Sequence, residues 1–134
     1  MSSKKYYISQ RGGTSELLLN QIVQELLKIQ FLNTQLHWRT TSFALHKATD
    51  GFGDEISSLT DKFLEVFMGK YQIRPKVLSL RLSPDVFDGD NYITAYREFQ
   101  GFLTSLELTD TSLSNIRDEI LGEVNKLFYL FTLH

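Results

Sequence analysis

Apolar side chains recur at helical spacing in the segment that opens the regular part of the chain. At about 100° per residue, one face of this segment consists of Leu18, Ile22, Leu26, Ile29 and Leu36. Thr14, a favourable N-cap residue, precedes them, and Glu16 lies in the first turn, where a negative charge is stabilising. The pattern predicts a first helix over residues 14–39 with this face in the core.

The same segment has a second apolar row, about 100–180° around the helix from the first. It consists of Val23, Leu27, Phe31 and Trp38. A helix at the surface of a lone small bundle needs only one apolar stripe. The second row therefore predicts that another surface, such as a second subunit, covers this helix. His37 falls between the two rows.

A second helix is predicted over residues 43–68, with Ser42 as its N-cap. Its core face consists of Phe52, Ile56, Leu59, Phe63 and Val66. The opposite sector, about 120–220° away, holds residue types that bind metals. These are His46, Asp50, Asp54, Asp61 and Glu65. This polar face therefore points away from the core of its own bundle.

Residues 69–90 interrupt the helical pattern, because they contain both prolines of the chain and a polar run. Two further helices are predicted, over residues 91–107 and from a cap at Thr109 or Asp110 to Leu133. A connection of about 20 residues is too long for a tight helical hairpin and suits a crossover along the bundle. The predicted fold is all-α, a ferritin-like four-helix bundle with a long crossover between its second and third helices (B and C).

Composition narrows the class of protein. The 134 residues fit one domain, with residues 14–134 as the bundle and residues 1–13 as a flexible N-terminal arm. Disulfides and thiolate chemistry are excluded, because the sequence has no cysteine. The net charge of -2 does not favour DNA as a partner, and the arm offers only Lys4 and Lys5 for phosphate contacts. No apolar run suggests a signal peptide or a membrane span, so a soluble, cytoplasmic protein is expected.

Asp61 and Glu65 lie four residues apart on the second predicted helix, which places their carboxylates about 5–6 Å apart on one face. Such a pair can bind Fe(II), Mn(II) or Mg(II), and an added imidazole shifts the preference towards iron or zinc. The plain alternatives are a solvated acidic face and, for His37, a packed histidine. Glu119 and Glu123 form a competing pair, but the sequence has no Glu-x-x-His motif of an intra-bundle di-iron centre.

Several motifs together resemble the signature of the Dps family, the ferritin-like mini-ferritins named as DNA-binding proteins from starved cells. In that family a His-Trp pair ends the first helix, a Leu-His-like pair opens the second, and an Asp-x-x-x-Glu motif follows. The matching residues are His37-Trp38, Phe43, Leu45-His46, Asp50-Gly51-Phe52, Asp61-x-x-x-Glu65 and the segment from Glu123 to Tyr129.

The resemblance implies a ferroxidase site shared between two subunits. His37 of one subunit, with Asp61 and Glu65 of its two-fold partner, would supply the primary iron ligands and the catalytic residues. His46 would serve a second, weaker iron position. Asp50 would orient a histidine from outside the ligand set.

The resemblance also implies a role for Trp38, which would stand next to the iron and could donate an electron. The assembly implied is a homo-oligomer built from two-fold dimers, up to a dodecameric shell that stores Fe(III). The predicted function is oxidation of Fe(II) and storage of the product, which protects against oxidative damage. Two alternatives stay open: a non-catalytic ferritin-like structural or interaction protein, and a protein that compacts nucleic acid.

Overall fold

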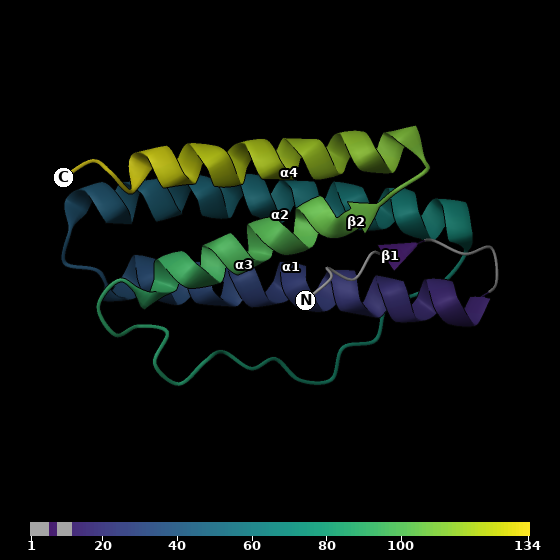
Figure 1. The fold of residues 1–134 in the computed structure, drawn as a ribbon, viewed down its shortest axis with the longest axis horizontal. Coiled ribbons are helices and arrows are strands. Elements are labelled where there is room, and N and C mark those ends of the chain that lie inside the picture. The colour runs from purple at the N-terminus through teal and green to yellow at the C-terminus, as the bar shows by residue number, and fades with distance from the viewer. Residues whose placement is uncertain (1–5, 8–11) are drawn as a thin grey trace.

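The computed structural model describes residues 6–7 and 12–134 of the chain. In that part it contains four helices, α1 (Gly12–Arg39), α2 (Phe43–Tyr71), α3 (Asn91–Ser105) and α4 (Thr111–Leu130). Two short strands, β1 (Tyr6–Tyr7) and β2 (Leu106–Glu107), pair in parallel and form the only sheet among the described residues. The predicted four-helix bundle is confirmed (Figure 1).

The hydrophobic core lies between the helices, and α2 packs most extensively, against α1 on one side and α4 on the other. All five predicted core residues of α1 are buried. Near the end of α2, however, Val66 is only half-buried, and Phe67 is fully buried instead. Phe67 lies four residues after the buried Phe63, so the two rings share one helix face.

Residues 72–90 connect α2 to α3 along the length of the bundle, so that α2 and α3 run in the same direction (Figure 1). Side-chain contacts hold this segment to α1. The Lys76 backbone N–H donates to Asn20 Oδ1 at 2.7 Å, and the Arg39 guanidinium lies 4.7 Å from the centre of the Phe87 ring. Val86 is buried in the core. The connection is thus packed against the helices.

The helix ends differ from the predicted ones by a few residues. Ser42 caps α2 as expected, since its side chain accepts a hydrogen bond from the Leu45 backbone N–H. The helix continues to Tyr71 and ends where Gln72 takes a left-handed conformation, with φ of 55°. Most of the predicted flexible arm, residues 1–13, lies outside the described residues, but Tyr6–Tyr7 within it form β1 and α1 already begins at Gly12.

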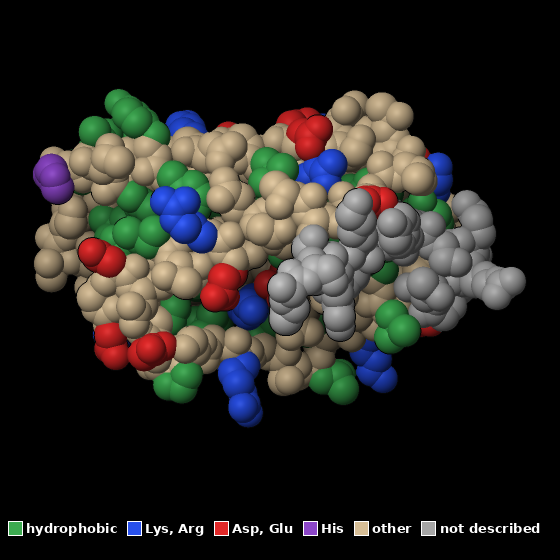
Figure 2. All heavy atoms as spheres, viewed as in Figure 1, with side chains coloured by type: hydrophobic (Ala, Val, Ile, Leu, Met, Phe, Trp, Pro, Cys, Tyr) green, Lys and Arg blue, Asp and Glu red, His purple; other side chains and the backbone are tan. Residues whose placement is uncertain are grey.

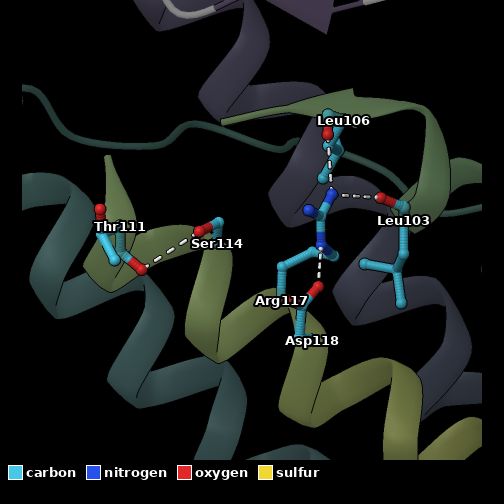
Figure 3. Close-up of polar contacts among 6 residues, drawn as sticks. All are labelled: Leu103, Leu106, Thr111, Ser114, Arg117 and Asp118. Carbon is cyan, nitrogen blue, oxygen red and sulfur yellow. Dashed lines mark hydrogen bonds and ion pairs between the residues drawn. The ribbon is translucent and has the colours of Figure 1, made fainter. Parts of the chain in front are cut away.

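The third helix ends at Ser105, two residues before its predicted end, where the backbone becomes extended. Arg117 of α4 binds the backbone at this point. Its Nη1 donates to the carbonyl oxygens of Leu103 at 3.0 Å and Leu106 at 2.7 Å (Figure 3). Its Nε donates to Asp118 at 2.7 Å. The two bonds from Nη1 reach backbone carbonyl groups at the C-terminal end of the helix, where Leu103 O also accepts the Leu106 backbone N–H. Leu106 then continues in an extended conformation as part of β2.

The surface is mixed in charge. On the face seen in Figure 2, acidic and basic side chains are interspersed over α3 and the segment of residues 72–90. In the last turn of α2, Lys70 donates to Asp110, the cap of α4, at 2.6 Å, and this bond holds the pKa of Asp110 below its usual range. Nowhere in the described residues is a helix both long enough and apolar enough to span a bilayer.

Candidate metal centre

His37 and His46 lie face to face where the end of α1 meets the start of α2. Their ring centroids are 3.9 Å apart, and the ring planes differ by 18°. His37 Nδ1 lies 2.9 Å from the carbonyl oxygen of His46, and His46 Nδ1 lies 3.1 Å from the carbonyl oxygen of His37. Each ring is therefore bound to the backbone of the other residue.

This reciprocal contact determines which ring nitrogen holds the proton. A carbonyl oxygen can only accept a hydrogen bond, so both Nδ1 atoms must be donors. In the neutral rings, the lone pair then lies on Nε2 of His37 and of His46. An imidazole whose Nδ1–H donates to a backbone carbonyl is the usual state of a metal-ligating histidine.

A polar network continues from His37 into the bundle. Thr49 Oγ1 lies 3.1 Å from His37 Nδ1, and Thr49 is 1% exposed. Asn33 Nδ2 donates to the Thr49 carbonyl oxygen at 2.9 Å. The Tyr96 hydroxyl of α3 donates to Asn33 Oδ1 at 2.7 Å. Buried polar groups are tolerated where each has a partner, as these have.

Burial affects Tyr96 strongly. The side chain is fully buried, with its ring edge-on to Phe52 and Phe131. Removal of the phenol from water raises the pKa of Tyr96 far above its usual range. The phenol thus keeps its proton and remains the donor to Asn33.

A cleft of about 340 Å³ opens between α1 and α2 next to this network. It brings together His37 of α1, a predicted ligand, and Asp50 of α2, which was predicted to orient a histidine, together with Asp54. The other residues that line it are Gln30, Asn33, Thr34, Thr49, Gly53 and Ser57. The Nδ1 atoms of both histidines are occupied by carbonyl groups, so Asp50 lies in the cleft without orienting either ring through Nδ1.

Asp61 and Glu65 lie farther along α2, exposed and outside the lining of the cleft. Neither forms an ion pair with another described residue. Among the described residues of one chain, no three histidine or carboxylate side chains gather closely enough to hold a metal ion. A single chain therefore does not assemble the predicted iron ligands by itself.

The second apolar row of α1 reaches the surface beside the cleft. Leu27 is 38% exposed, Phe31 47% and Trp38 74%, whereas Val23 belongs to the core. Phe43, across the turn to α2, is also largely exposed. Large apolar side chains exposed on one helix face are typical of a surface that contacts another protein.

The competing carboxylates of α4 are in different surroundings. Glu119 lies 3.7 Å from Lys62, in an exposed ion pair. Glu123 lines a separate groove together with Lys47 and Lys126. The lining of that groove includes no histidine, and the described ion-pair partner of Glu119 is a lysine, so the histidines favour the α1–α2 site.

Asn33, Thr49 and Tyr96 were not predicted as part of a site. Asn33 alone gave a signal in the sequence, since it places an amide close to the apolar positions of the α1 core face. Thr49 and Tyr96 fit their helices as ordinary buried residues, and only the meeting of α1, α2 and α3 brings them together.

A sequence profile for a family of unknown function, DUF5856, matches residues 37–131. The chain belongs to this family. No curated protein and no solved structure matches it. The segment shared with DUF5856 begins at His37 and contains every predicted ligand, together with α2, α3, α4 and the connections between them.

Proposed function

We propose that this DUF5856 protein is a ferritin-like protein of Dps type, which binds Fe(II) between two copies of the chain and oxidises it. The observation that supports this most is the state of His37. Its Nδ1–H is bound by a carbonyl oxygen, its Nε2 has no partner among the described residues, and it lines an open cleft. Imidazole and carboxylate together suit Fe(II).

Two copies are needed because Asp61 and Glu65 lie away from the histidines of their own chain. An isologous dimer that joins the α1–α2 faces would place these acids of one copy opposite His37 of the other. It would also cover the exposed side chains of Phe31 and Trp38 on the same face. Without a cation, burial of the acids at such an interface would be costly, since buried like charges destabilise one another.

The proposed roles follow from these positions. His37 of one copy, with Asp61 and Glu65 of the other, binds the substrate Fe(II), and His46 offers a second imidazole nearby. Asp50 adds negative charge to the cleft. Each Fe(II) loses one electron, and O2 or H2O2 accepts the electrons and takes up protons to form water. Trp38, exposed at the same surface, would supply a further electron.

The topology supports the ferritin-like assignment. α2 and α3 run in the same direction and are joined by the long segment of residues 72–90, which is how one crossover converts a simple bundle into the ferritin-like order. A closed shell of such dimers would collect the Fe(III) product. This assembly provides storage as well as oxidation.

Anaerobic Fe(II) titration followed by oxygen addition tests the proposal. Wild type is expected to bind Fe(II) and to form Fe(III) rapidly after oxygen is added. The double variant Asp61→Ala, Glu65→Ala should lose both while its helical circular dichroism is unchanged. The matched control is Glu119→Ala, Glu123→Ala, which also removes two helix carboxylates and should keep activity.

Two results would contradict the proposal. If the α2 double variant oxidises Fe(II) as fast as wild type, the iron ligands are elsewhere. Loss of Fe(II) oxidation in the α4 double variant would then place the ligands on α4. If wild type binds no Fe(II) but sediments as a dimer, the protein is a structural or interaction protein that uses the same surface.

A further inference from the structure

Thr49 lies where α2 meets His37 of α1. Its hydroxyl has two carbonyl acceptors within its own helix, Leu45 O at 2.9 Å and His46 O at 3.1 Å. Since the single hydroxyl hydrogen is used there, the oxygen meets His37 Nδ1, 3.1 Å away, as an acceptor. The His37 Nδ1–H therefore has two acceptors, Thr49 Oγ1 and the His46 carbonyl oxygen at 2.9 Å.

We infer that Thr49 is a positioning residue for His37, which gives the Nδ1–H a second acceptor and holds the imidazole in one orientation, so that Nε2 stays available to a metal ion. The inference rests on the proposed function, in which Nε2 binds Fe(II). When Nε2 shares its lone pair with a cation, the ring becomes a stronger donor at Nδ1, and a second acceptor then stabilises the bound state. Loss of such an outer hydrogen bond typically weakens metal binding about 10–100-fold.

Thr49 is itself held from two other helices. Asn33 of α1 donates to its carbonyl oxygen, and Tyr96 of α3 donates to Asn33. Gly53 leaves room for this contact, because a Cβ atom at that position would lie 3.1 Å from Asn33 Nδ2. The position of the Thr49 hydroxyl is thus fixed by the core, independently of any metal.

Thr49→Val tests the inference, because valine keeps the shape of threonine and removes only the hydroxyl group. Thr49→Ser restores the hydroxyl. Thr60→Val is the matched control, since Thr60 is also buried between α1 and α2 and accepts a hydrogen bond from Gln30 at 3.1 Å, but bonds to neither histidine. If Thr49→Val fails to fold, Thr49→Ala replaces it in the same measurements.

Two readouts are needed. In anaerobic titrations with Fe(II), Thr49→Val is expected to bind about 10-fold more weakly than wild type, and the other two variants within about 2-fold of it. In NMR spectra of the metal-free proteins, the His37 Nδ1–H signal should be seen in wild type, Thr49→Ser and Thr60→Val. It should exchange faster with water in Thr49→Val, where the His46 carbonyl oxygen is the one acceptor left to it.

Thr49→Val must show both the weaker Fe(II) binding and the change in the His37 Nδ1–H signal. If only one of the two is seen, Thr49 does not position His37. Unchanged Fe(II) affinity in Thr49→Val, with wild type binding normally, leaves the proposed function intact and rejects only the role of Thr49. If wild type itself binds no Fe(II), the proposed function fails and this inference fails with it.

Discussion

Replacement of Tyr96 by phenylalanine removes one hydroxyl group from the centre of the bundle. That hydroxyl donates a 2.7 Å hydrogen bond to Asn33 Oδ1, and Tyr96 and Asn33 are 0% and 2% exposed. In the variant, the amide oxygen stays buried with no donor, which costs about 1–3 kcal/mol. The free energy of unfolding at pH 7 is therefore expected to fall by about 1–3 kcal/mol.

The dependence on pH gives the same prediction a second test. Burial keeps the pKa of Tyr96 far above its usual range in the folded protein, whereas in the unfolded chain a tyrosine titrates near pH 10. Above about pH 10 the unfolded state thus binds one proton fewer at Tyr96, and this group alone lowers the free energy of unfolding of wild type by about 1.4 kcal/mol per pH unit. Phenylalanine has no such proton. The difference in the free energy of unfolding between wild type and variant should therefore narrow by about 1.4 kcal/mol between pH 7 and pH 11.

Urea unfolding followed by circular dichroism at pH 7 and pH 11 measures both effects. Tyr129→Phe is the control, because Tyr129 is 64% exposed and its replacement should change the free energy of unfolding little at pH 7. A Tyr96→Phe protein within about 0.5 kcal/mol of wild type at pH 7, or a gap that stays constant to pH 11, would refute the reasoning.

The remaining predictions concern the helix contact at Gly53 and the apolar face of α1. Gly53→Ala should lower the melting temperature, because its Cβ would lie 3.1 Å from Asn33 Nδ2. Gly51→Ala has nothing within 4 Å of its Cβ and should stabilise the helix by up to about 1 kcal/mol. Equal shifts of the melting temperature in the two variants would show that Asn33 has room to move. Phe31→Glu should convert the proposed dimer to a folded monomer in sedimentation at tens of micromolar, and a variant that sediments like wild type would place the interface elsewhere.

The helices could be predicted from the sequence because local features determine them. Apolar spacing identified the core of α1, and Ser42 was correctly predicted as the cap of α2. The exposure of Phe31 and Trp38 follows from the same spacing, since their row lies off the core face. What covers that row stays a prediction.

The arrangement of the candidate site was less predictable. His37 and His46 were singled out by residue type, but the bonds between each Nδ1 and the other residue's carbonyl depend on how the α1–α2 turn closes. The contact of Thr49 with His37 likewise arises from the approach of two helices, which Gly53 permits. The end of α3 was predicted two residues too far along the chain, because Arg117, which binds the Leu106 carbonyl oxygen there, belongs to a different helix.

In the proposed function, two copies of the chain share one iron site. Anomalous diffraction at the iron edge, from crystals soaked anaerobically with Fe(II), tests it most directly. The proposal predicts an iron peak bound by Nε2 of His37 from one copy and by the carboxylates of Asp61 and Glu65 from the other. An iron peak at Glu119 and Glu123, or no iron peak at the α1–α2 face, would contradict it.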